Sequence, residues 1–163
     1  MGRVALLIGG NLGDRYRLIE QATEQIRQRI GSVVALSRIY ETEPWGVFDE
    51  STPNFLNRAL IVDTTRSPHE VLREALAIEA DLGRVRPRHS SSDCQQTTRT
   101  YHSRPMDIDL IFYDDLVIDT PELTLPHPRM HLRHFVLEPL VEIMPDYVHP
   151  LLHKTMKQLL NEI

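Results

Sequence analysis

Two carboxylates separated by one residue, Asp107 and Asp109, are the clearest chemical feature of this sequence. The surrounding segment 106–113 is otherwise apolar and is predicted to form a β-strand. Alternate residues of a strand share a face, so both carboxylates should point the same way, with Cα atoms roughly 7 Å apart. The other face, directed into the core, should carry Met106, Ile108, Leu110 and Phe112.

Two carboxylates at that spacing repel each other unless a cation lies between them. Mg²⁺ suits the position because it takes few carboxylates and leaves room for phosphate oxygens and water. Aspartate is depleted in strands, which favours this interpretation. The alternative is a solvated strand face that carries Asp107 and Asp109 by chance.

Arginines gather just before this strand. Arg84 and Arg86 could be bidentate phosphate donors, and Arg104 lies just before the strand, whereas Arg88 and Arg99 are interpreted as charges of a solvated loop. Paired carboxylates beside arginines indicate a metal–polyphosphate site, in which arginines neutralise the charge on the transferred group. The sequence contains no Walker A motif, glycine-rich kinase loop or G-x-G-x-x-G fingerprint, so side chains would have to hold the phosphates.

A histidine lies between two prolines, at Pro126-His127-Pro128. The prolines restrain the backbone, so the imidazole of His127 could donate to a phosphate oxygen. His127, His131 and His134 could instead bind zinc. Against zinc, the first lies outside the helix expected there, and no Cys, Asp or Glu is close to them in sequence. Arg133 could be a charge on a helix surface.

Hydrophobic spacing predicts the elements that must position these residues. Strands are expected at 4–8, 33–40, 55–64 and 106–113, and helices at 13–30, 67–82, 130–142 and 153–162. Ser67 and Glu70 form a capping box at the start of the second helix. Residues 41–53 and 84–104 are expected as loops, 116–118 as a partner strand for 106–113, and 121–128 as an extended segment. Strands adjacent along the chain imply antiparallel pairing, which favours an α+β two-layer sandwich of ferredoxin-like type.

Length and composition narrow the function class. The chain has 163 residues with 41% hydrophobic and 25% charged residues, which fits one domain, residues 1–163, without a linker. The net charge of −5 weighs against general binding to nucleic acid or a membrane surface. A single cysteine, Cys94, fits a reducing compartment. The apolar run 4–8 is too short for a signal or membrane segment, so a soluble, cytoplasmic protein is expected. We also expect it to be a monomer.

Several segments together resemble one enzyme family. They are Gly9-Gly10-Asn11-Leu12-Gly13, Tyr40-Glu41-Thr42-Glu43-Pro44-Trp45-Gly46, Phe55-Leu56-Asn57, Gly83-Arg84-Val85-Arg86, Arg104-Pro105-Met106-Asp107-Ile108-Asp109-Leu110, Pro126-His127 and Arg133-His134-Phe135-Val136-Leu137-Glu138-Pro139-Leu140. Each segment is a weak signal, but the set, in this order, is similar to the 6-hydroxymethyl-7,8-dihydropterin pyrophosphokinase family of folate biosynthesis. The resemblance implies transfer of pyrophosphate from ATP to the pterin hydroxymethyl group, a ferredoxin-like α/β/α sandwich with a mainly antiparallel sheet, and two Mg²⁺ ions.

The resemblance also implies roles for individual residues. Asp107 and Asp109 match the metal ligands, and Arg84 and Arg86 match catalytic arginines of a mobile loop. The matches to the ATP site are Glu79, Arg84, Arg86, Arg104, Leu110, Thr124, His127 and Arg133. Those to the pterin site are Thr42, Pro44, Trp45, Phe55, Asn57 and Phe135, with the two phenylalanines on either side of the pterin ring. The chain departs from the family at Tyr101, where a tryptophan is usual, in a longer loop at 87–100, and at Pro128.

Two other functions stay open at this point. A different ATP-dependent transferase, such as a nucleotidyltransferase, could use the same metal site but would release free pyrophosphate. A ferredoxin-like module that binds RNA or a regulator should expose basic or aromatic residues on its sheet, and the acidic pair argues against it.

Overall fold

The main sheet of this computed structural model has the strand order β2-β4-β1-β5, with β3 also paired to β4, and every pair is antiparallel. The structure describes residues 2–11, 13–42, 54–82 and 106–163. In chain order the elements are β1 (Gly2–Gly10), α1 (Arg15–Arg29), β2 (Ser32–Leu36), β3 (Tyr40–Thr42), β4 (Phe55–Thr64), α2 (Pro68–Leu82), β5 (Asp107–Tyr113), β6 (Ile118–Asp119), β7 (Thr124–Leu125), the 3₁₀ helix η2 (Met130–Leu132), α3 (His134–Ile143) and α4 (Met156–Asn161).

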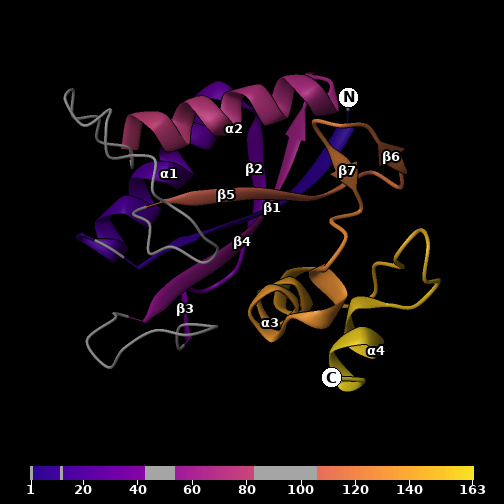
Figure 1. Cartoon of the computed structure of the whole chain (residues 1–163). Helices are drawn as coiled ribbons and strands as arrows, with labels where there is room; N and C mark the ends of the chain where they lie inside the picture. Colours follow the sequence, from indigo (N-terminus) through magenta and orange to yellow (C-terminus); the bar gives the residue numbers. More distant parts are fainter. Residues whose placement is uncertain (1, 12, 43–53, 83–105) are drawn as a thin grey trace.

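Helices cover both faces of this sheet (Figure 1). Helices α1 and α2 bury Ile26 and Ile78 in a first core against Leu6 of β1. Helices α3 and α4 bury a second core on the other face, against Leu7 of β1. Because β1 lies between two apolar layers, its side chains are buried in both directions, which explains its unbroken apolar run. The expected ferredoxin-like α/β/α sandwich with an antiparallel sheet is confirmed.

The two-layer arrangement derived from the strand order alone was incomplete, because α3 adds a third layer. Its buried residues Val136, Leu137 and Leu140 follow helical spacing and match the apolar outer face of β1 and β4. Within the described ranges, none of the helices combines the length and apolar character needed to cross a bilayer.

The expected capping box at α2 is present. The Ser67 N–H donates to Glu70 Oε1 at 2.7 Å, and the Glu70 N–H donates to Ser67 Oγ at 3.2 Å. A second box, between Thr155 and Gln158, starts α4. These contacts satisfy backbone donors that the first helical turn leaves unpaired, so the local sequence fixes both helix starts.

The strand expected at 33–40 is divided into β2 and β3. Ser37 is the cause: its N–H donates to the Ala59 carbonyl at 2.9 Å, while its Oγ accepts from the Ala59 N–H at 2.9 Å. A side chain thus replaces one backbone group of the ladder, and the chain re-enters the sheet as β3 at Tyr40. The loop prediction for 41–53 was therefore wrong for Glu41 and Thr42.

The C-terminal third holds the other corrections. Residues 116–118 do not pair with β5; instead β6 and β7 form a separate hairpin, Ile118 opposite Leu125. The helix expected at 130–142 is broken by the extended backbone of Arg133 (φ −125°, ψ 115°) into η2 and α3. The last helix begins only at Met156, because residues before Thr155 form turns around His149.

Strand β5 contains a register shift that the alternation argument missed. Ala5 pairs with Phe112, but Leu6 pairs with Leu110, so Ile111 is an extra residue on β5. Beyond it the faces exchange: Phe112 lies in the second core, not with Ile108 and Leu110 in the first. The prediction that Phe112 shares a face with these residues was wrong.

Candidate active site

One cross-strand row carries the residues of greatest chemical interest. Asp107 of β5 lies opposite Gly9 of β1, Gly9 lies opposite Asn57 of β4, and Asn57 lies opposite Tyr40 of β3. Paired residues of antiparallel strands point to the same face. Four strands that are far apart in sequence therefore present this row together, at what we call the site end of the sheet, the C-terminal end of β1.

Asp109 lies in the next row inward, opposite Leu7. Leu7 belongs to the second core, so Asp109, and with it Asp107, lies on the face that α3 covers. Both aspartates are half-buried. Met106, which precedes them, and Ile108, which lies between them, are buried in the first core. The predicted division of faces is confirmed for this part of β5.

The aspartate pair fits Mg²⁺ by its chemistry. It offers oxygen donors only, on neighbouring positions of one face, at a partly solvated end of the sheet. Among the described residues, no group of three or more His, Cys, Asp or Glu side chains could hold a metal ion. Two carboxylates with the remaining positions left to phosphate oxygens and water is the coordination that Mg²⁺ favours in nucleotide enzymes. The zinc alternative at His127, His131 and His134 has no such group among the described residues.

Gly9 leaves room for the Asn57 side chain. A Cβ on Gly9 would collide with the Leu56 backbone carbonyl and would lie 2.6 Å from Asn57 Oδ1, so both the backbone of β4 and the Asn57 amide lie close against the glycine. Asn57 is 5% exposed, and its Nδ2 donates to Thr42 Oγ1 at 3.1 Å. Phe55 lies opposite Thr42 and is half-buried. Phe55, Asn57 and Thr42, all expected at the pterin site, therefore lie together beside the aspartate row.

His127 is held next to β5 with a defined tautomer. The backbone N–H of His127 donates to the Ile111 carbonyl at 3.0 Å, and its ring Nδ1 accepts from the backbone N–H of Arg129 at 3.3 Å. Since Nδ1 accepts, the neutral ring carries its proton on Nε2. Burial lowers the pKa of His127, and the charges of Arg133 and Arg129 lower it further, while Asp107 raises it. The ring is thus kept neutral, with an Nε2–H donor in the electrostatic reach of the candidate metal ligands.

Arg133 and Phe135 lie at the start of α3. The Arg133 guanidinium carbon is 5.6 Å from the centre of the Phe135 ring, a cation–π contact. Phe135 packs partly on the second core, and α3 packs on β4 and β3, the strands of Asn57 and Thr42. This packing orders the aromatic ring on the same face as the aspartate row.

The remaining predicted residues are placed differently. Glu79 does not face solvent freely: its Oε2 accepts from the Ile108 N–H at 2.6 Å. Leu110 is buried in the first core, so its side chain points away from the aspartate face. Thr124 is exposed on β7. Arg84, Arg86, Arg104, Pro44 and Trp45 lie outside the described residues.

Sequence reasoning missed a polar cluster that ties α3 to β3. Glu142 Oε1 accepts from the Tyr40 hydroxyl at 2.7 Å and from the Arg38 N–H at 3.1 Å. Burial, followed by the bond to Glu142, raises the pKa of Tyr40. No local pattern could reveal it, because Tyr40 and Glu142 are about a hundred positions apart in the chain. The contact fixes the strand that carries Thr42.

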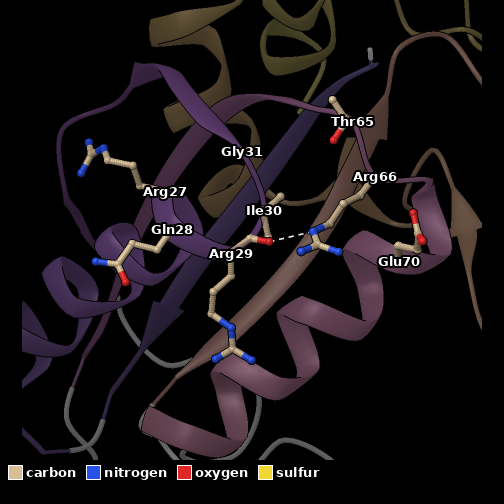
Figure 2. A pocket seen from close by; sticks show the side chains of 8 residues that line it. All are labelled: Arg27, Gln28, Arg29, Ile30, Gly31, Thr65, Arg66 and Glu70. Carbon is tan, nitrogen blue, oxygen red and sulfur yellow. Dashed lines mark hydrogen bonds between the residues drawn. The ribbon is translucent and has the colours of Figure 1, made fainter.

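A polar hollow lies at the opposite end of the sheet (Figure 2). Figure 2 shows Arg29 and Arg66 between α1 and α2. The hollow is lined by Arg27, Gln28, Arg29, Ile30, Gly31, Thr65, Arg66 and Glu70. Arg29 pairs with Glu74 at 3.2 Å and Asp81 at 2.9 Å, while Arg66 Nε donates to the Arg29 carbonyl at 2.8 Å. These arginines therefore connect the two helices, and the hollow is separate from the aspartate row.

Comparisons with known proteins point to one family. Residues 5–145 match the family model described as 7,8-dihydro-6-hydroxymethylpterin-pyrophosphokinase. A 2-amino-4-hydroxy-6-hydroxymethyldihydropteridine pyrophosphokinase of Porphyromonas gingivalis is 40% identical over 151 residues, 92% of this chain and 95% of that protein. The Aquifex aeolicus protein of the same name is 34% identical over 158 residues, 97% of this chain and 90% of that protein.

Solved structures give the same fold. Wild-type Plasmodium falciparum HPPK-DHPS superposes with a TM-score of 0.74 at 16% sequence identity. The superposition covers 99% of this chain and 44% of that chain, so this chain spans less than half of its length.

Proposed function

Because this chain belongs to the 7,8-dihydro-6-hydroxymethylpterin-pyrophosphokinase family, we propose that the site end of its sheet is where the family's reaction takes place. The chain transfers pyrophosphate from ATP to 6-hydroxymethyl-7,8-dihydropterin in folate biosynthesis. The hydroxymethyl oxygen bonds to the β-phosphorus, the bond from that phosphorus to the oxygen bridging the α-phosphate breaks, and AMP leaves. The hydroxyl proton is lost to water, and the product is the pterin diphosphate.

The cross-strand row of Asp107, Gly9 and Asn57 is the observation that carries the proposal. It brings a carboxylate pair suited to Mg²⁺ next to an amide suited to a heterocycle, across three strands. Asp107 and Asp109 would hold two Mg²⁺ ions together with the phosphates of ATP. When bound, the ions neutralise phosphate charge and make the hydroxyl oxygen a better nucleophile.

His127 and Arg133 would bind the phosphates. The neutral His127 ring presents Nε2–H, and Arg133 supplies a permanent positive charge beside it. Arg84, Arg86 and Arg104 keep their proposed roles as further phosphate contacts, with the first two assisting catalysis. Glu79, Leu110 and Thr124 remain proposed for the ATP site, Leu110 through its backbone because its side chain is buried.

Phe55, Asn57 and Phe135 would form the pterin site with Thr42. The half-buried aromatic rings would lie on the two faces of the flat ring system. Thr42 Oγ1 accepts one amide proton of Asn57, which orients the amide so that its other polar positions can pair with the pterin edge. Pro44 and Trp45 are proposed as the lining beyond Thr42.

The wider setting is proposed on simpler grounds. The acidic net charge supports the absence of nucleic-acid and membrane partners, and the single cysteine supports a cytoplasmic location. We propose that one domain of 1–163 works as a monomer.

Product analysis tests the proposal. Wild-type protein with ATP, Mg²⁺ and the hydroxymethyl pterin should yield AMP and pterin diphosphate by mass spectrometry, and a chelator should stop the reaction until Mg²⁺ is restored. Asp107→Ala and Asp109→Ala should each reduce turnover by about 100-fold or more. Asp119→Ala, on the exposed end of β6, is the matched control and should keep wild-type turnover. Near-normal turnover in either of the first two variants would end the metal assignment.

A further inference from the structure

The outer edge of β5 lies next to the two candidate metal ligands. Within the described residues β5 pairs with β1 and is the last strand of the sheet. A strand at the end of a sheet leaves alternate backbone groups without a ladder partner. The position of Asp107 and Asp109 therefore depends on what else holds this edge.

Helix α2 supplies a carboxylate to that edge. Glu79 Oε2 accepts from the Ile108 N–H at 2.6 Å, short for an amide donor and typical of a bond to a charged acceptor. Glu79 follows Ile78, which is fully buried in the first core, and α2 packs along β5. The helix packing thus brings the Glu79 carboxylate to β5 at the edge of the buried interface.

Ile108 is the residue between the two aspartates. Its side chain is 4% exposed, within the first core. In an antiparallel strand, the backbone groups of successive residues point alternately toward the paired strand and away from it. The Ile108 N–H bonds to Glu79 and so points away from β1. The backbone groups of Asp107 and Asp109 are therefore the ones that bond to β1. Residues 107–109 of β5 are consequently held by β1, by the first core and by Glu79.

We propose that Glu79 is a positioning residue, which fixes the spacing and direction of Asp107 and Asp109 by holding the backbone between them. This inference rests on the proposed function, in which these aspartates bind the metal. Its contact with the protein backbone adds a second role to the place in the ATP site proposed for Glu79 above.

Two substitutions separate the hydrogen bond from the charge. Glu79→Gln keeps an oxygen acceptor of the same reach without the charge, whereas Glu79→Met keeps the length of the side chain and removes the acceptor. Loss of a residue that orients a metal ligand weakens metal affinity by about 10- to 100-fold. We expect about tenfold weaker metal binding for Glu79→Met and a change of less than about threefold for Glu79→Gln.

The binding experiment uses Mn²⁺ as the probe. Free Mn²⁺ is measured by electron paramagnetic resonance during titration of the protein with a non-hydrolysable ATP analogue present. Asp107→Ala is included: if it binds Mn²⁺ as wild-type protein does, the proposed metal site fails. If Asp107→Ala is weak but Glu79→Met equals wild type, the metal site stands and the positioning role is overturned. Equal weakening in Glu79→Gln and Glu79→Met also overturns it, because the charge would then be responsible.

The backbone contact is tested directly by NMR. In the wild-type protein the Ile108 amide proton should resonate far downfield and exchange slowly with solvent; rapid exchange would overturn the proposal without any variant. Glu79→Gln should retain the protection and Glu79→Met should lose it.

Glu74→Ala is the matched control for loss of a half-buried acid on α2. Its partners are Arg29 and Arg66, away from the site end. It should lower thermal stability yet leave both Mn²⁺ affinity and the Ile108 amide unchanged. Weaker Mn²⁺ binding in this control would mean that general loosening of α2 explains the effect, and the specific role of Glu79 would be rejected.

Discussion

His149 should make the protein lose stability between pH 7 and pH 5. This residue is 4% exposed, and its Nδ1 accepts from the N–H groups of Leu151 and Leu152, both at 3.1 Å. Its ring packs edge-on against Phe112 at 5.7 Å between ring centres. A protonated ring could not accept at Nδ1, so the folded state requires neutral His149.

The magnitude follows from the pKa. Burial, with smaller contributions from His131 and His153, lowers the pKa of His149 from 6.5 to about 4. The unfolded chain therefore binds the proton more readily, and the stabilisation is fully present above about pH 6.5 and lost as the pH falls toward 4. Between 6.5 and 5 the loss is about 2 kcal/mol, at about 1.36 kcal/mol per pH unit. For a chain of this size that is about 4–8 °C in Tm.

The test compares wild type with His149→Asn by urea unfolding at pH 7, 6 and 5. The Asn Oδ1 can take the place of Nδ1 as acceptor for the following N–H groups but does not titrate. The variant should be less stable at pH 7 by about 1–2 kcal/mol, from lost ring packing, and should lose about 2 kcal/mol less on going to pH 5. Parallel pH profiles for the two proteins would refute the reasoning.

His153→Asn is the matched control. His153 is exposed and adopts a left-handed backbone (φ 59°), which asparagine tolerates well. This variant should keep nearly all of the wild-type pH slope, because His153 is the smallest of the three causes that lower the pKa of His149. Carboxylates whose pKa is lowered, such as that of Asp63 beside Arg3, titrate below the window used. The lowered pKa of His127 also makes the protein less stable as the pH falls, but it does so equally in wild type and in both variants. The difference between the pH profiles of wild type and His149→Asn therefore reports on His149.

Two further predictions concern the site. Gly9→Ala should raise the pterin KM by about tenfold or more and lower stability by about 1–3 kcal/mol, because its Cβ would collide with the Leu56 backbone carbonyl and lie 2.6 Å from Asn57 Oδ1; steady-state kinetics with each substrate varied checks this, and an unchanged pterin KM would argue against the proposed pterin contact of Asn57. His127→Gln, whose amide can donate near the Nε2 position, should retain most of kcat/KM for ATP, whereas His127→Asn, with a shorter side chain, should lose about 10- to 100-fold, the value of a hydrogen bond to a charged group. Equal activity of the two His127 variants would argue against donation from Nε2.

Much of the fold could be predicted because the elements carry local signals. The capping box of Ser67 and Glu70 marks the start of α2, and apolar spacing marks the helices on either side of the sheet. The failures come from contacts that such signals do not contain. Ser37 ends β2 through bonds with Ala59, more than twenty positions away, and Ile111 becomes an extra residue only because Leu6 pairs with Leu110.

The site likewise has features that the local sequence determines and features that distant contacts determine. Alternation within β5 predicts that Asp107 and Asp109 share a face, and the structure confirms it, since each needs only its own strand. Strand alternation could not predict that Asn57 lies one strand beyond Gly9 in the same row, because pairing partners are set by the register of the whole sheet. The family resemblance grouped Asn57 with Phe55 and Thr42, but it did not reveal the Glu79 contact with the backbone of Ile108.

The extra residue at Ile111 explains how one short strand serves both a core and a site. Before the extra residue, the face of β5 that is directed toward the second core carries Asp107 and Asp109. The same face then carries Ile111 itself and Phe112, both of which are buried in the second core. Strict alternation would have placed Tyr113 on that face, and Phe112 on the first-core side. The shift instead puts Phe112 under Tyr147, with ring centres 4.5 Å apart, and the Ile111 carbonyl accepts the His127 N–H. The extra residue, which the sequence pattern does not predict, therefore brings His127 beside the aspartates, and restoring regular pairing should displace that histidine before it disturbs the proposed metal ligands.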